Sequence, residues 1–427
     1  MRKYKILFCC NSHPNNIGGA EKVCKNAVDI LSEKYDVTVL TQPYTGRKMD
    51  NVVELQGKTV YSYMPELAKY IDTHDFDLYI SFGYGKYFTD YIGQWTKTHN
   101  KKSIVMPCGF FHTSSNAIFK KIYSLLVTKK TLNNYSCRIT ATEWEKDFWV
   151  DTFGVDAHNT FVIPYNLEDN FTKYKSTNIL KKYGLKKKNY LLYLGRAGPN
   201  KLVQLLKDSY NMTDKKIPLV IAGKGNEEFN YLPRNELKLM NITSTERIKI
   251  HTNMNILSMG SVSEDDKKTL ISNAKLVIFP SSYESFGMCI LESIALRTPV
   301  IGSNIEPFKE ILHNQDYLFE NNVNDLARKL SRSYDDEFIL PKIQIENYKH
   351  SLLTLVDGIR NNFLPQRCYP SFFDTSQYIF NALKCKKAQV TEGDIVLLAL
   401  IVLIICVIVA SIGYIVPMIF KALSMVW

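Results

Sequence analysis

The chain has 427 residues, of which 45% are hydrophobic and 22% are charged, and its formal net charge is +11. This length favours two domains and an appendage, and the nine scattered cysteines without a C-x-x-C repeat argue against a disulfide framework or a metal site. The positive charge indicates an anionic partner such as a phosphorylated substrate or lipid, but no nucleic-acid-binding motif is present, so we expect no nucleic-acid partner.

The first part of the chain alternates short apolar runs with a longer amphipathic stretch. The earliest run, residues 6–10, is shorter than the ~7–15 residues of a signal-peptide core, so we expect a buried strand there. A helical pattern follows over residues 20–35. Strands are predicted at residues 5–10, 36–40, 78–81 and 103–106. This alternation predicts a parallel sheet with helices on both of its faces.

The alternation restarts near residue 190. Further strands are predicted at residues 189–195, 217–223, 275–280 and 299–302. We therefore predict an α/β protein with two Rossmann-like, doubly wound halves, residues 1–165 and residues 166–345. Ligands bind at the carboxyl ends of strands in such folds, so two facing halves would place the active site in the cleft between them. Residues 346–394 are predicted to hold a helix that closes the second half or crosses back to the first, followed by a juxtamembrane segment.

A glycine pair, Gly18 and Gly19, follows the first predicted strand and opens the first predicted helix. A helix start with little side-chain bulk suits the approach of a phosphate or a sugar to the backbone. The pattern is neither a dinucleotide-binding fingerprint nor a Walker A loop, and it is also typical of a plain tight turn.

Two cations follow the strand at residues 189–195. Arg196 and Lys201 lie five residues apart in the loop after Gly195. An arginine fork can bind a diphosphate through two hydrogen bonds, and a lysine adds a point charge. Taken alone, this pair also fits a solvated surface loop.

The strongest motif lies at residues 275–302. A strand runs into a loop that carries Glu284 and Gly287, and a helix with Glu292 follows over residues 288–296. The free N–H groups at the start of a helix suit a diphosphate. A carboxylate one turn into the helix can accept hydrogen bonds from ribose hydroxyls. Without the surrounding strand and helix, the two glutamates would predict only an ordinary charged surface.

Together these motifs resemble the retaining glycosyltransferases of family 4, whose fold is GT-B. The resemblance covers roughly residues 4–360 and is most specific over residues 270–302. The segment at residues 162–166 is similar to the family's interdomain V-I-P-N-G, but Tyr165 precedes the Asn and Leu167 replaces the Gly. We therefore expect the joint between the halves to bend differently from that of the family.

The resemblance implies a role for each candidate residue in binding a nucleotide diphosphate sugar. Arg196 and Lys201 would hold the diphosphate and stabilise it as the leaving group. Glu292 would bind the ribose, and Glu284 would bind hydroxyls of the transferred sugar. Gly18 and Gly19 would approach a phosphate or the acceptor. Backbone N–H groups would come from Ser285, Phe286, Gly287 and Met288.

The resemblance also implies the chemistry of the reaction. His112 matches a family histidine near the anomeric centre, so the expected catalytic residues are His112, Glu284, Arg196 and Lys201. The configuration at the anomeric carbon would be retained. Neither a metal ion nor a cofactor is expected, and stabilisation of the departing diphosphate would be the main catalytic effect.

Residues 395–420 contain no charged residue. A helix of this length would span ~39 Å, which exceeds the ~30 Å hydrocarbon core of a bilayer. Only seven residues follow it, so we predict a single-pass tail anchor. Lys384, Lys386 and Lys387 precede the segment and Lys421 alone follows it, which predicts a cytosolic catalytic domain.

Residues 117–130 mix apolar residues with four lysines at helical spacing. Such a helix could rest on anionic lipid or could equally pack on the sheet, and with the tail anchor it suggests a lipid-linked glycan acceptor. Two other functions remain open at this point. One is a catalytically inactive tail-anchored scaffold that keeps the fold, and the other is a GT-B nucleotide-sugar epimerase.

Overall fold

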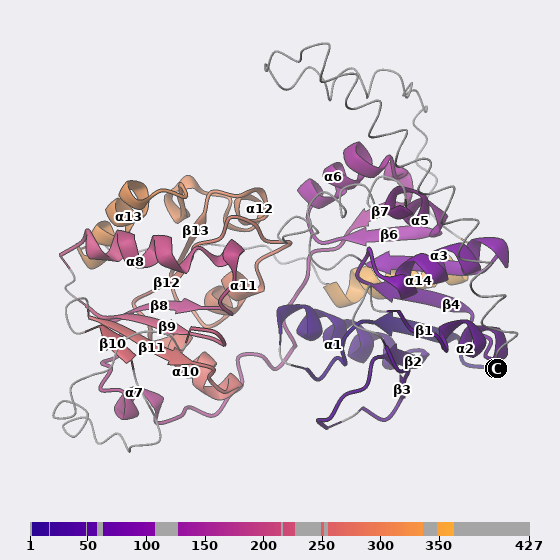
Figure 1. The fold of residues 1–427 in the computed structure, drawn as a ribbon, viewed down its shortest axis with the longest axis horizontal. Helices are drawn as coiled ribbons and strands as arrows, with labels where there is room; N and C mark the ends of the chain where they lie inside the picture. Colours follow the sequence, from indigo (N-terminus) through magenta and orange to yellow (C-terminus); the bar gives the residue numbers. More distant parts are fainter. Residues whose placement is uncertain are drawn as a thin grey trace, which may run out of the picture. The chain divides into compact units, whose positions relative to one another are not determined.

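The computed structural model describes nine stretches of the chain: residues 2–16, 18–47, 49–57, 63–106, 127–214, 217–226, 249–251, 255–335 and 348–362. Figure 1 shows two sheets built from separate parts of the chain, each with helices packed along it. Both sheets lie within one compact unit, Met1–Gln366.

The first sheet is parallel throughout, with the strand order β3-β2-β1-β4-β5-β6-β7. Its strands are β1 (Lys5–Cys10), β2 (Asp36–Thr41), β3 (Val52–Glu54), β4 (Leu78–Phe82), β5 (Lys102–Met106), β6 (Cys137–Thr140) and β7 (Thr160–Val162). Its helices are α1 (Gly19–Ser32), α2 (Leu67–Thr73), α3 (Tyr87–Thr98), α5 (Lys129–Asn134) and α6 (Glu143–Phe153). The strand order reverses at β1, so the loop after β1, which holds the glycine pair, lies where such sheets bind ligands.

The second sheet has the order β10-β11-β9-β8-β12-β13-β14. Its strands are β8 (Leu191–Leu194), β9 (Leu219–Ala222), β10 (Lys249–His251), β11 (Ile256–Gly260), β12 (Leu276–Phe279), β13 (Val300–Ser303) and β14 (Leu318–Phe319). Its helices are α7 (Ile179–Lys182), α8 (Val203–Asn211), α10 (Glu264–Asn273), α11 (Met288–Ala295), α12 (Glu306–Leu312) and α13 (Val323–Asp335).

One pair of strands in the second sheet departs from the parallel arrangement that the sequence predicts. The edge strand β10 runs antiparallel to β11. Only four residues separate the two strands, and a parallel pairing needs a crossover of a dozen residues or more. The short connection therefore imposes the antiparallel pairing.

The strands are apolar on both faces because helices cover both sides of each sheet. In β1, Phe8 belongs to one buried cluster and its neighbour Leu7 to another. In β8, Leu192 and Tyr193 alternate in the same way. The continuous apolar runs in the sequence are thus explained by burial on both sides.

Helix α14 (Tyr348–Arg360) follows the second sheet in the chain but packs against α1 of the first half. The Tyr35 hydroxyl donates to Asp357 Oδ1 at 2.8 Å, and Lys102 Nζ donates to the Ile359 carbonyl at 2.6 Å. Of the two arrangements that the sequence allowed for this helix, the structure therefore has the crossover to the first half.

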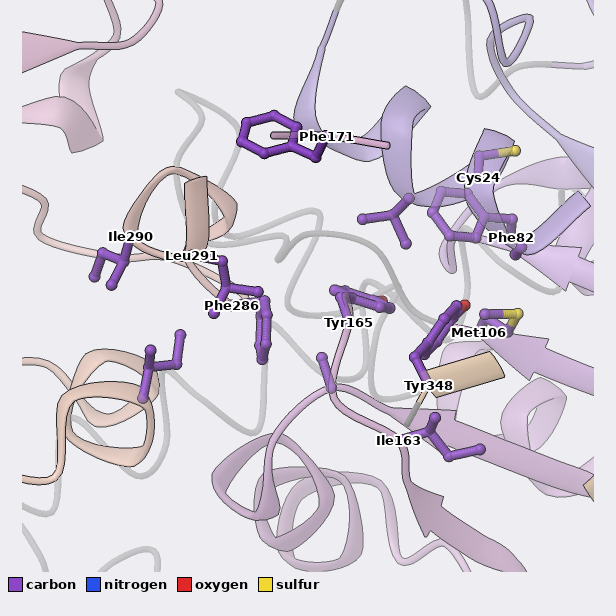
Figure 2. Packing of buried hydrophobic residues seen from close by; sticks show 14 of the residues in the cluster. Cys24, Phe82, Met106, Ile163, Tyr165, Phe171, Phe286, Ile290, Leu291 and Tyr348 are labelled. Carbon is purple, nitrogen blue, oxygen red and sulfur yellow. The ribbon is translucent and has the colours of Figure 1, made fainter. Parts of the chain in front are cut away.

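Aromatic rings line the joint between the two halves. The Tyr165 ring stands edge-on to Phe286 at 5.3 Å and to Tyr348 at 6.3 Å between ring centroids. Figure 2 shows these three buried side chains near one another, with Leu291 of α11 beside Phe286. Tyr165, one of the two residues by which the joint departs from the family's V-I-P-N-G segment, thus packs into the apolar core.

Candidate functional site

Two candidate residues meet at the carboxyl ends of neighbouring strands. Strands β8 and β12 pair directly, so the loops that follow them lie side by side. Lys201 Nζ in the first loop forms an ion pair with Glu284 Oε1 in the second. The same carboxylate oxygen accepts a hydrogen bond from Ser281 Oγ at 2.9 Å. The structure therefore brings Lys201 and Glu284 into one cluster.

Backbone contacts hold these two loops together. The Ser282 N–H donates to the Asn200 carbonyl at 2.9 Å, and Asn200 Nδ2 donates to the Tyr283 carbonyl at 3.2 Å. These bonds fix the positions of Lys201 and Glu284 without using either charged group. The Glu284 carboxylate and the Lys201 ammonium group can therefore separate from each other and each bind a ligand instead.

Arg196 is exposed at the start of the loop after β8. A third loop, after β9, supports this position, because the Ala197 N–H donates to the Lys224 carbonyl at 2.8 Å and Asn226 Nδ2 donates to the Gly195 carbonyl at 2.7 Å. Gly223 has a φ of +130°, and a Cβ there would lie 2.0 Å from the Gly195 carbonyl oxygen. The close approach of the two loops thus requires glycine at position 223.

The loop after β12 turns into α11 at Gly287, which has a φ of +116°. A Cβ at this position would lie 2.7 Å from Phe308. The helix starts at Met288, and the first turn of a helix carries N–H groups that have no partner inside it. Ser285 and Met288 are partly exposed on either side of Gly287, whereas the Phe286 side chain is buried. Phe286 therefore holds the turn by packing, and only its backbone can serve a ligand.

Glu292 lies one turn inside α11 and is 2% exposed. Its Oε1 accepts hydrogen bonds from Lys267 Nζ at 2.7 Å and from Lys22 Nζ at 3.2 Å. Its Oε2 is buried and has no hydrogen-bond partner among the described residues. Glu264 completes the group, with its Oε2 at 2.5 Å from Lys22 and 3.0 Å from Lys267.

The two lysines and the two glutamates of this group stabilise one another's charged forms. Burial alone would lower the pKa of Lys267, but the carboxylates of Glu292 and Glu264 outweigh it and raise the pKa well above its ordinary value. Cys289, next to the start of α11, has its pKa raised to about 12, first by burial and then by the Glu292 charge. Cys289 is therefore a neutral thiol, and we assign it no nucleophilic role.

The glycine pair opens α1, as the sequence predicts. Gly18 precedes the helix in an extended conformation, and a Cβ on it would meet the Glu21 carboxylate at 2.0 Å. A Cβ on Gly19 would meet no other described atom within 4 Å. Packing among the described residues therefore does not explain the glycine at position 19, and these residues leave room there for a ligand.

The structure adds residues that the motifs did not identify, namely Lys22, Lys267 and Ser281. Lys22 directly follows the Gly-Gly-Ala-Glu turn, yet its partner Glu292 is 270 residues away in the chain. No local pattern reports such a contact. Ser281 lies three residues before Glu284, and its position in the same loop was the one available signal.

Four predicted features lie outside the described residues: His112, the start of the basic stretch up to residue 126, the juxtamembrane segment over residues 363–394, and the apolar segment at residues 395–420. Within the described part of the chain, no helix is long and apolar enough to cross a membrane.

A protein-family model matches most of the second half of the described chain. Residues 175–351 match the family "Glycosyl transferases group 1". This stretch contains every candidate residue of the second half.

Two curated relatives are bacterial enzymes. O-antigen chain mannosyltransferase B of Escherichia coli is 27% identical over 164 residues, which are 37% of this chain and 40% of that protein. O-antigen chain mannosyltransferase RfbU of Salmonella typhimurium is 26% identical over 206 residues, 47% of this chain and 51% of that protein. The chain thus spans about half the length of these relatives or less.

Solved structures match most of the chain. Sucrose-phosphate synthase from Thermosynechococcus elongatus has a TM-score of 0.61 at 15% identity and covers 90% of this chain and 100% of its own. Anabaena HepE, solved in complex with UDP-glucose, has a TM-score of 0.60 at 16% identity and covers 84% of this chain and 98% of its own. These likenesses confirm the predicted GT-B arrangement of two α/β halves.

Proposed function

We propose that this protein is a glycosyltransferase that moves a sugar from a nucleotide diphosphate sugar to a glycan acceptor. The observation that carries the proposal is the meeting of Lys201 and Glu284 at the ends of β8 and β12, next to the start of α11. A cation, a carboxylate and a helix start at one edge of a parallel sheet form a suitable set for a diphosphate and a sugar. The match of residues 175–351 to a glycosyltransferase family supports the same conclusion.

In the proposed reaction, the donor diphosphate replaces Glu284 as the ion-pair partner of Lys201. Arg196 and Lys201 then neutralise the charge that develops on the leaving diphosphate, which is the main catalytic contribution. Glu284, released from Lys201, accepts hydrogen bonds from hydroxyls of the transferred sugar. Glu292 binds the ribose. We propose that His112 lies beside the anomeric carbon, that configuration is retained, and that neither a metal ion nor a cofactor takes part.

We propose mannose as the first sugar to test, because two curated relatives are named mannosyltransferases. UDP-glucose is the second, because the structural neighbour HepE was solved with it.

A thermal-shift screen with UDP, GDP and ADP tests the donor site. A ligand that binds only the folded state raises its stability in proportion to the logarithm of the ligand concentration. We expect one nucleoside diphosphate to raise the melting temperature, and the matching nucleotide sugar then to be consumed with EDTA present. If none of the three shifts the melting temperature, the proposed function is wrong and the inactive scaffold is favoured.

Product analysis separates transfer from epimerisation. A transferase joins the sugar to an acceptor and releases the nucleoside diphosphate, whereas an epimerase returns a changed sugar without consuming an acceptor. Retention is read from the anomeric proton coupling of the product. A product of inverted configuration would contradict the mechanism proposed here while leaving the transferase function intact.

We further propose that residues 395–420 anchor the protein in a membrane, with the catalytic halves in the cytosol, and that the acceptor is lipid-linked. We expect the full chain to sediment with membranes and to glycosylate a lipid-linked acceptor far faster than a version that ends at residue 385. Equal activity of the two versions on the lipid-linked acceptor would refute the lipid-acceptor proposal without affecting the donor site.

A further inference from the structure

Four charged side chains from three helices form one network around Glu292. Lys22 comes from α1 in the first half, Glu264 and Lys267 from α10, and Glu292 from α11. Each lysine lies within 3.2 Å of both carboxylates. The network is balanced in formal charge, with two positive and two negative groups.

The network treats the two oxygens of Glu292 differently. Both lysines donate to Oε1, at 2.7 Å and 3.2 Å, whereas Oε2 is buried and accepts no hydrogen bond from any described residue. A buried acceptor without a partner is destabilising, because it has lost its hydrogen bonds to water. A donor group from a ligand would remove this cost, so the carboxylate is oriented with one oxygen held and the other ready to bind.

Lys22 connects this oriented carboxylate to the first half. It lies in the first turn of α1, where its backbone N–H donates to the Gly18 carbonyl at 3.1 Å. Its side chain is 27% exposed, and that of Lys267 is 14% exposed, so solvent screens both ion pairs incompletely. The orientation of the Glu292 carboxylate thus depends in part on Lys22, which lies three residues after the glycine pair.

We propose that Lys22 and Lys267 are positioning residues of the donor site, which hold Glu292 Oε1 so that Oε2 accepts a hydrogen bond from a ribose hydroxyl. The inference rests on the proposed function. Because Lys22 belongs to the first half, recognition of the ribose depends on both halves of the protein. An ion pair that served only to join the halves would stabilise the fold. It would not distinguish a nucleotide with ribose from the same nucleotide with dideoxyribose.

The test measures binding of UDP and of 2′,3′-dideoxy-UDP to the full chain by calorimetry, with GDP and its dideoxy analogue in parallel. We expect the wild-type protein to bind the ribose form of one base about tenfold more tightly than its dideoxy form, the ratio that one hydrogen bond to a charged group supplies. Lys22→Met and Lys267→Met should weaken the ribose form and bring this ratio towards one. Lys22→Arg should restore it.

Lys25→Met is the matched control, because Lys25 lies on the same helix and pairs with Asp29 inside the first half. It should leave the ratio unchanged. Thermal unfolding of each variant checks the fold, and Lys22→Met carries the test if Lys267→Met does not fold.

The outcomes separate the inference from the proposed function. If the wild-type protein binds no nucleoside diphosphate, the proposed function fails and the inference fails with it. If the wild-type protein prefers the ribose form and both methionine variants keep that preference, the inference alone is overturned. A parallel loss of affinity for both forms would assign the lysines a purely structural role and would also overturn it.

Discussion

The pairing of Lys201 with Glu284 means that each candidate residue neutralises the other before a donor arrives. Glu284→Gln keeps the shape of the side chain but releases Lys201. We expect transfer to fall about a hundredfold, the scale of losing one preorganised electrostatic contact. Binding of the nucleoside diphosphate alone should stay the same or tighten, because Lys201 no longer leaves a carboxylate to meet it.

Steady-state kinetics and calorimetry check this prediction together. Ser282→Ala is the control, because Ser282 contacts the same loop mainly through its backbone. A Glu284→Gln variant that binds the nucleoside diphosphate tenfold more weakly would show that Glu284 serves the diphosphate rather than the sugar.

The buried environment of Glu145 predicts that the stability of the fold depends on pH. It is 1% exposed, and burial raises its pKa to about 8, against the lowering effect of the hydrogen bond from the Ala141 N–H. A raised pKa in the folded state means that folding favours the protonated form. The stabilisation is complete below the unfolded pKa, near 4.5, and is lost as the pH rises through about 8.

Glu145→Gln mimics the protonated side chain at every pH. We expect urea unfolding to show wild-type stability falling between pH 5 and pH 9, and a smaller fall for the variant. Asp90, whose pKa burial raises to about 7, contributes in the same direction, so Asp90→Asn is the parallel variant. A wild-type protein whose stability is independent of pH over this range would contradict both assignments.

At the scale of elements, the starts of α1 and α11 offer a matched pair of glycines. Gly287 has positive φ and Phe308 beside it, whereas Gly19 is helical and has open space around it among the described residues. Gly287→Ala should destabilise the fold by ~1–3 kcal/mol through backbone strain. Gly19→Ala should raise stability slightly, since Ala favours a helix over Gly by up to ~1 kcal/mol.

The two variants should therefore separate stability from function. We expect Gly19→Ala to reduce transfer while raising the melting temperature, because its Cβ would fill the space left for phosphate or acceptor. Thermal unfolding and transfer assays on both variants give the comparison. Full activity in Gly19→Ala would remove the glycine from the candidate site.

The elements that the sequence predicts best are the central strands. The predicted strands at residues 5–10 and 78–81 are mostly apolar, and β1 and β4 begin at the predicted residues. The short strands β3 and β14 were not predicted, because two or three residues carry no periodicity. β7 and β14 also lie at sheet edges, where pairing rather than composition defines the strand.

At the scale of the whole molecule, the sequence predicts the site only where the chain keeps its residues close. Glu284, Gly287 and Glu292 fall in one strand–loop–helix unit, so their spacing along the chain reports their spacing in space. The approach of Lys22 to Glu292 depends on how the two halves meet. The spacing of residues along the chain does not predict that contact. The resemblance to a family implied two facing halves, but it did not imply roles for Lys22 and Lys267.

A second contact between the halves allows the whole arrangement to be tested apart from the donor site. Glu310 of α12 accepts hydrogen bonds from the Trp144 N–H at 2.7 Å and from the Glu143 N–H at 2.9 Å, at the start of α6. A carboxylate at a helix start accepts hydrogen bonds from the free N–H groups and interacts favourably with the positive end of the helix dipole. Glu310→Ala should therefore lower the free energy of unfolding by ~1–2 kcal/mol, the scale of losing a helix cap.

Glu306→Ala is the control, because Glu306 lies on the same helix but pairs with Lys309 within it. Urea unfolding followed by tryptophan fluorescence suits the measurement, since Trp144 lies at the contact. We expect the Glu310 variant to unfold at lower urea than the Glu306 variant, while its discrimination between ribose and dideoxyribose nucleotides stays intact, because Lys22 still reaches Glu292. Equal unfolding of the two variants would mean that the contact between α12 and α6 contributes nothing to holding the halves together, and the aromatic joint at Tyr165, α14 and the lysine network would then carry that role.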